Sequence, residues 1–217
     1  MSDLLTIDAT ATRWAPEVRE GLPLVVMLHG YGSDENDLFA LRPFLPDGIA
    51  VASVAAPLTP PWPAPGRSWY PIEALEGRHP DGVTEAAQAL LRWLDAEAAD
   101  APKIALLGFS QGAAVSIQAM RLDAARFGAI VALSGYATPG DLPADESLRE
   151  LRPRVFWGRG TNDDVIPQPL VDHTAQWLPE RADLTGRVYP GLTHSVSEEE
   201  LQDVRVFLDS WLDESAD

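Results

Sequence analysis

The feature that most constrains the fold is the segment G-F-S-Q-G at residues 108–112. An apolar, strand-like run, K-I-A-L-L, precedes it, and a helix-like run, A-A-V-S-I-Q-A-M, follows it. A chain that passes from strand to helix within so few residues must turn sharply, and the two glycines remove side chains that would collide in such a turn. The segment therefore predicts that Ser110 lies on a tight strand-to-helix turn.

The rest of the chain alternates short apolar runs with helical patterns, which predicts a mostly parallel sheet with helices on both faces. We expect one domain over residues 1–217. The first fifteen residues are expected to form an antiparallel edge hairpin. The last helix should open with the capping-box pair Ser197 and Glu200. Strands are predicted at 24–28, 49–54, 103–108, 129–134, 154–157 and 187–189, and helices at about 34–44, from 82 onward, and at 111–125, 168–177 and 197–212.

One segment, residues 57–80, fits neither the helical nor the strand period. It contains seven prolines and two tryptophans, Trp62 and Trp69. A loop of this length inside a compact domain is usually functional or disordered. Its aromatic residues favour an ordered loop, which we expect at the rim of a pocket.

A serine hydroxyl is a weak nucleophile at neutral pH and needs a base, which a third group must hold in the right tautomer. In folds with this turn, the acid and then the histidine follow the serine, each after a later strand. The strand at 154–157 is followed by G-R-G-T-N-D-D-V-I-P, which offers Asp163 and Asp164. The strand at 187–189 is followed by P-G-L-T-H-S, which places His194 before the last helix. We expect His194 to be the base for Ser110.

Such a reaction also needs N–H donors for a developing oxyanion. The segment L-H-G-Y-G at 28–32 lies at the end of the 24–28 strand, from which this fold supplies one donor. The start of the helix after Ser110 supplies the other. We therefore predict an oxyanion hole made by the backbone N–H groups of Tyr31 and Gln111.

Several segments together resemble the phospholipase/carboxylesterase family, which includes bacterial carboxylesterases and acyl-protein thioesterases. The resemblance covers about residues 20–212. Two departures stand out: Ala113, where many members have a second glycine, and Asp164, where many have proline. The segments that carry the resemblance are G-F-S-Q-G-A, L-H-G-Y-G-S-D-E-N-D-L, R-S-W-Y, L-S-G-Y, G-T-N-D-D-V-I-P and G-L-T-H-S.

The resemblance implies an α/β-hydrolase fold without a separate cap domain, with esterase or thioesterase activity on acyl chains and no cofactor. It implies Asp163, rather than Asp164, as the acid between Ser110 and His194. Without a cap, the pocket should be a shallow groove that suits short to medium acyl chains. The predicted lining of this groove is Tyr31, Trp69, Tyr136 and Val165.

The composition limits the classes of partner that we expect the protein to bind. The 33 acidic and 16 basic residues give a formal charge of −17, which repels nucleic acid and anionic lipid surfaces. No apolar run approaches the ~18 residues of a membrane span, and no signal segment is visible at the start, so we expect a cytoplasmic protein without stable membrane insertion. The absence of cysteine excludes thiolate chemistry, and four widely spaced histidines predict no metal site.

The favoured function is a serine carboxylesterase that acts on esters, and on acyl-thioesters as an extension of the same chemistry. A phospholipase or a peptidase with the same three residues is the first alternative. A catalytically silent binding protein of the same fold is a remote one. The sequence does not decide between a monomer and a homodimer.

Overall fold

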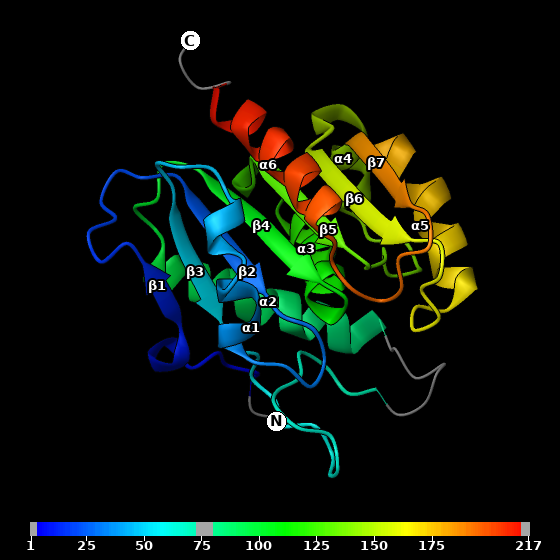
Figure 1. Ribbon diagram of the computed structural model, residues 1–217, viewed down its shortest axis with the longest axis horizontal. Coiled ribbons are helices and arrows are strands. Elements are labelled where there is room, and N and C mark those ends of the chain that lie inside the picture. Colours follow the sequence, from blue (N-terminus) through cyan, green and yellow to red (C-terminus); the bar gives the residue numbers. More distant parts are fainter. Residues whose placement is uncertain (1–3, 73–79, 214–217) are drawn as a thin grey trace.

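The computed structural model describes residues 4–72 and 80–213, and its centre is one seven-stranded sheet in the order β1-β3-β2-β4-β5-β6-β7 (Figure 1). Neighbouring strands run parallel, except that β1 pairs antiparallel with β3. The chain adds β3 on one side of β2 and β4 on the other, and ligands bind at the carboxyl ends of strands where the order reverses in this way. The strands are β1 (Arg13–Ala15), β2 (Leu24–Leu28), β3 (Ala50–Val54), β4 (Ile104–Phe109), β5 (Ala129–Leu133), β6 (Arg154–Gly160) and β7 (Asp183–Tyr189).

Helices cover both faces of this sheet. Helices α1 and α6 lie over one face and the other four over the opposite face (Figure 1). Every residue of β2 is buried, because its side chains enter the two cores alternately. This is why the strand appears as a continuous apolar run. The helices are α1 (Glu35–Phe39), α2 (Pro80–Glu97), α3 (Gln111–Leu122), α4 (Asp145–Leu151), α5 (Gln168–Arg181) and α6 (Glu198–Asp213).

The predicted α/β-hydrolase architecture is confirmed, with most strand and helix positions correct to within a few residues. Two elements were poorly predicted. Strand β7 begins at Asp183 rather than Arg187, because this edge strand is largely exposed and has no apolar run. Helix α4 was not predicted, because it buries only Asp145 and Leu148.

Two predictions near the amino terminus were wrong. The helix expected over 34–44 ends at Phe39 and is followed by a 3-10 turn at Arg42–Phe44. Pro43 explains the break, because it has no N–H and its ring collides with the carbonyl four residues earlier. The expected hairpin does not form in the described residues: β1 is an antiparallel edge strand, but its partner is β3.

Within the segment predicted at 57–80, residues 57–72 form an irregular loop that two isolated β-bridges hold in place. One bridge joins Ser33 to Arg67 and the other joins Leu58 to Ser68. Trp69 and Tyr70 are buried, whereas Trp62 is exposed. Residues 73–79 lie outside the described residues, and Pro80 begins α2.

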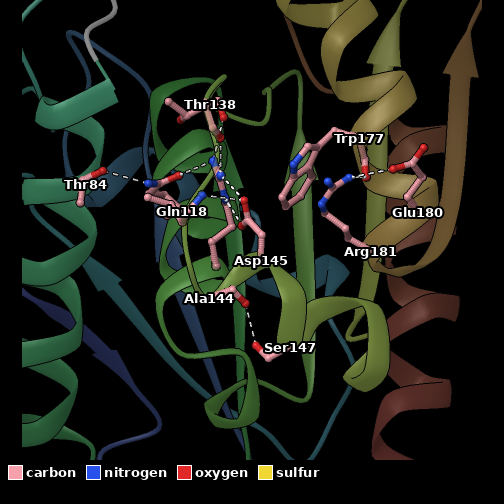
Figure 2. Close-up of polar contacts among 12 residues, drawn as sticks. Thr84, Gln118, Thr138, Ala144, Asp145, Ser147, Trp177, Glu180 and Arg181 are labelled. Atoms are coloured by element: carbon pink, nitrogen blue, oxygen red, sulfur yellow. Dashed lines mark hydrogen bonds and ion pairs between the residues drawn. The ribbon is translucent and has the colours of Figure 1, made fainter.

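A buried ionic cluster ties α3 to the segment after β5 and to α4. The Arg121 side chain is 1% exposed and donates to both carboxylate oxygens of Asp145, at 2.8 and 2.6 Å. It also donates to the Gln118 side chain and to the carbonyls of Thr138 and Gly140. Figure 2 shows the labelled Gln118, Thr138 and Asp145 gathered in this cluster. Its hydrogen-bonding capacity is therefore filled within the protein.

We predict that Arg121→Met destabilises the protein by about 3–5 kcal/mol, because it leaves the buried Asp145 carboxylate without its partner. Urea unfolding would measure the loss. The matched control is Arg149→Met, which breaks an exposed pair with Glu146 and should cost less than about 0.5 kcal/mol. Equal losses in the two variants would contradict the prediction.

Candidate active site

Ser110 stands between the last residue of β4 and the first residue of α3, with φ 56° and ψ −113°. A non-glycine residue in this region costs of order 1–3 kcal/mol and persists only where its surroundings enforce it. Two backbone hydrogen bonds hold the turn: Ser110 donates to the Leu133 carbonyl, and Ala114 donates to the Ser110 carbonyl. This sharp turn places the serine hydroxyl at the carboxyl end of the sheet.

The flanking glycines are required by contact as well as by conformation. A Cβ atom on Gly112 would collide with the Leu28 carbonyl, and one on Gly108 would collide with the backbone of Gly112. Helix α3 therefore begins directly against the end of β2. Ala113, where many family members have glycine, fits because its methyl group packs where Gly135 has no side chain.

Three side chains from separate loops form a continuous hydrogen-bonded chain. His194 Nε2 lies 2.9 Å from Ser110 Oγ, and His194 Nδ1 lies 2.8 Å from Asp163 Oδ2. All three side chains are largely buried, with 15% exposure for His194 and 7% for Asp163. The structure thus brings together the serine, histidine and acid that the sequence singled out.

Asp163 uses its second oxygen within its own loop. Its Oδ1 accepts the backbone N–H groups of Val165 and Ile166 at 3.0 and 3.2 Å. Burial raises the pKa of Asp163, but hydrogen bonds from His194 and from these two N–H groups outweigh it and hold the pKa below its usual value. The carboxylate is therefore ionised at neutral pH. Asp164, by contrast, is exposed.

The two expected oxyanion donors flank Ser110. Tyr31 follows Gly30, where an added Cβ would lie only 3.5 Å from Ser110 Cβ. In the described part of the chain, the Tyr31 N–H has no acceptor. Gln111 is the first residue of α3, where a helix leaves its N–H groups without intrahelical acceptors.

A cavity of about 190 Å³ opens at these residues. Of the predicted lining, Tyr31, Tyr136 and Val165 contribute to it, and Trp69 does not. Sequence reasoning missed five lining residues: Gly30, Tyr70, Ile72, Phe109 and Ile166. Tyr70 could have been found, since it belongs to the R-S-W-Y segment, but nothing in the sequence says which of its two aromatic residues faces the cavity.

Trp69 is fully buried beside the cavity and contacts the segments of both predicted oxyanion donors. Its indole N–H donates to the His29 carbonyl at 2.8 Å, and its backbone N–H donates to Gln111 Oε1 at 2.9 Å. The Gln111 side chain also donates to the Tyr70 carbonyl. The structure therefore places Trp69 as a brace behind the site rather than as a groove wall.

One other histidine, His173, lies apart from the residues that line the Ser110 cavity. It is half-buried in α5, where burial and the nearby Arg121 and Arg181 charges lower its pKa. His79 lies outside the described residues. Among residues 4–72 and 80–213, no group of three His, Asp or Glu side chains could hold a metal ion.

A larger cavity, about 450 Å³, opens at the opposite end of the sheet, beside Leu24 and Ala50 at the starts of β2 and β3. Its lining contains none of the three hydrogen-bonded residues. In the ranges that the structure describes, no helix has the length and apolar character to cross a bilayer.

The sheet topology, the strained serine turn and the chain order serine, acid, histidine together define an α/β-hydrolase. The Phospholipase/Carboxylesterase family model matches residues 15–212, so the chain belongs to this family, and it is a serine hydrolase.

Individual relatives extend over nearly the whole chain. Acyl-protein thioesterase 1 of Debaryomyces hansenii is 29% identical over 229 residues, which cover 93% of this chain and 97% of that protein. The crystal structure of esterase PE8 has a TM-score of 0.77 at 28% identity, with 92% of this chain and 98% of that chain covered. Zea mays acyl-protein thioesterase 2 has a TM-score of 0.76 at 21% identity, with 93% and 98% covered, and shows the same fold.

The first turn of α6, which follows the His194 loop, contains a buried carboxylate. The Glu200 backbone N–H donates to Ser197 Oγ, as half of the predicted capping box. The other half was wrong: the Glu200 side chain packs under β6 at Gly158, and neither carboxylate oxygen has a hydrogen-bond partner among the described residues. Burial raises the pKa of Glu200 from 4.5 to about 7.

The pKa of Glu200 is higher in the folded protein than the value of 4.5 that applies to the unfolded chain. Glu200 therefore contributes stability to the folded protein at a pH below 4.5, and this contribution is lost as the pH rises towards 7. We predict that Glu200→Gln abolishes this loss, which amounts to roughly 2–3 kcal/mol between pH 5 and 8. Urea unfolding of both proteins across this range would measure it. Glu199→Gln, an exposed neighbour on the same turn, should keep the wild-type pH dependence. A Glu200→Gln profile parallel to wild type would contradict the assignment.

Proposed function

We propose that this protein is a carboxylesterase that hydrolyses esters and acyl-thioesters of short to medium acyl chains through an acyl-enzyme on Ser110. The observation that carries the proposal is the continuous Asp163–His194–Ser110 hydrogen-bond chain at the edge of a cavity. The relatives named as thioesterases and esterases support this substrate class.

In the first step, Ser110 Oγ attacks the acyl carbonyl carbon while His194 Nε2 takes its proton. Asp163 accepts the Nδ1–H of His194, so that Nε2 is left free as a base. The negative charge of Asp163 stabilises the imidazolium that forms. The carbonyl oxygen becomes an oxyanion, which the N–H groups of Tyr31 and Gln111 stabilise. The imidazolium then protonates the leaving alcohol or thiol as the bond to it breaks.

In the second step, His194 takes a proton from water, and the resulting hydroxyl attacks the acyl-enzyme carbonyl. The same two N–H donors stabilise the second oxyanion. Its collapse expels Ser110 Oγ, which recovers its proton from His194, and the carboxylic acid leaves. The acid and the base of both steps are therefore the same imidazole ring.

The small cavity supports the preference for short to medium chains. Each buried methylene contributes only ~0.8 kcal/mol, and a space of about 190 Å³ buries few of them. The charge of −17 supports a small acyl substrate over nucleic acid as the partner. The cytoplasmic location stays a prediction from the sequence.

The testing experiment measures kcat/KM for p-nitrophenyl esters and acyl-thioesters from two to sixteen carbons with wild type and Ser110→Ala. Ser110→Ala should lose activity by a factor of order 10⁶, because the acyl group has no attachment point. Ser116→Ala, which changes a buried serine of α3, is the control and should stay within about threefold of wild type.

Two results would overturn different parts of the proposal. Activity above a few percent in Ser110→Ala would exclude the acyl-enzyme on this residue. A steady rise in kcat/KM to sixteen carbons would retain the mechanism and exclude the short-chain preference. Labelling by a fluorophosphonate, located by mass spectrometry on the peptide that contains Ser110, provides an independent readout.

The two adjacent carboxylates give a sharper prediction. Asp163→Asn should lower kcat by a factor of order 10⁴, because an amide can present the wrong group to His194 Nδ1. Asp164→Asn should change kcat by less than about tenfold, since its side chain is exposed and only one charge is lost. The kcat values of the two variants test this prediction. A larger loss in Asp164→Asn than in Asp163→Asn would show that Asp164 is the acid that accepts from His194.

A further inference from the structure

His29 is a buried histidine that the mechanism above does not use. It follows β2 directly and is fully buried. Its ring makes two hydrogen bonds with the backbone: Nδ1 lies 2.7 Å from the Gly30 carbonyl, and Nε2 lies 3.1 Å from the Ala56 nitrogen. A backbone N–H can only donate, so Nε2 must be the unprotonated nitrogen. The proton is therefore on Nδ1, which donates to the Gly30 carbonyl.

This donation determines the direction of the next N–H group. The Gly30–Tyr31 peptide bond is trans, since the cis bonds of the described chain precede Pro16 and Pro63. In a trans peptide unit the carbonyl and the following N–H point in opposite directions. Two donors hold the Gly30 carbonyl, the His29 ring and the Ser33 N–H, the latter at 3.3 Å. The Tyr31 N–H is consequently directed away from them.

The opposite side of this peptide is where the reaction takes place. Gly30 packs against Ser110 and Phe109, so closely that an added Cβ would lie 3.1 Å from the Phe109 ring. Gly30, Tyr31 and Ser110 all line the 190 Å³ cavity. The Tyr31 N–H is without an acceptor in the described part of the protein.

We propose that His29 is a positioning residue of the oxyanion hole, and that its Nδ1–H orients the Gly30–Tyr31 peptide so that the Tyr31 N–H faces the reacting carbonyl. This inference rests on the proposed function, in which Tyr31 is one of the two donors. The role requires a neutral ring, because an imidazolium would direct a second N–H at Ala56. Burial, which lowers the pKa of His29, maintains that neutral form.

Two substitutions separate the two ring nitrogens. Asparagine places its amide where Nδ1 stands, and it can still donate to the Gly30 carbonyl. Glutamine reaches the position of Nε2, and it can accept from Ala56 but cannot make the orienting bond. We expect His29→Gln to lower kcat by about 100-fold, near the ~10²–10³ lost with one oxyanion donor. We expect His29→Asn to stay within about tenfold of wild type.

A second readout distinguishes positioning from general damage. The KM of His29→Gln should stay within about threefold, because the ground-state carbonyl makes weaker use of the oxyanion hole than the transition state. A trifluoromethyl ketone, which forms a tetrahedral adduct with serine, should lose affinity by the same factor as kcat/KM. Equal losses of kcat in the two variants, or losses that follow their melting temperatures, would overturn the proposal.

Spectroscopy of the wild-type enzyme tests the tautomer without relying on a stable variant. In protein labelled with ¹⁵N at histidine, at pH 7.5, one signal of a neutral ring protonated at Nδ1, distinct from that of His194, should disappear in His29→Asn. Assignment of His29 to the Nε2–H tautomer would overturn the proposal. Ser110→Ala keeps the two failures apart: if it retains turnover, the proposed function fails, whereas a dead Ser110→Ala with a fully active His29→Gln rejects only the role of His29.

Discussion

The close approach of Gly112 to the Leu28 carbonyl is the contact on which the rest of the site depends. It brings the first turn of α3 against the end of β2, and no side chain larger than hydrogen fits between them. The same turn forces Ser110 to a positive φ, a strain that the surrounding parallel sheet supports. One contact therefore places the serine between two backbone segments, one ending β2 and the other beginning α3, that can each offer an N–H group.

Hydrogen bonds of buried polar groups next to the cavity stabilise this arrangement. Trp69 donates to the His29 carbonyl and to the Gln111 side chain, so it links the two segments that flank Ser110. Unpaired buried polar groups are costly, and paired ones fix a geometry. The loop at 57–72 thus acts as a rigid support. The Arg121 cluster does the same for the chain between β5 and α4, the stretch that also contains Tyr136.

Three ionisable groups near the site show how one rule leads to different protonation states. Burial disfavours the charged form of His29, Asp163 and Glu200 alike. Asp163 receives three hydrogen bonds and stays ionised. Within the described residues Glu200 receives none at its carboxylate, so its pKa rises to about 7, and burial keeps the His29 ring neutral. Burial and the supply of hydrogen-bond donors together decide which group carries a charge.

The sequence alone determined most of the strands and helices in their chain order, the serine turn, and the loops that contain Asp163 and His194. Each of these depends on local patterns: apolar runs, glycine spacing and the chain order of three residues. Tertiary structure decided that Trp69 braces the site while Tyr70 lines the cavity, that β7 begins at Asp183, and that Glu200 turns inward. These depend on partners far away in the chain: Gln111 lies 42 residues from Trp69, and Ala56 lies 27 residues from His29. No local pattern records which distant backbone group a side chain will meet, so hydrogen-bond direction and burial are settled only when the chain has packed.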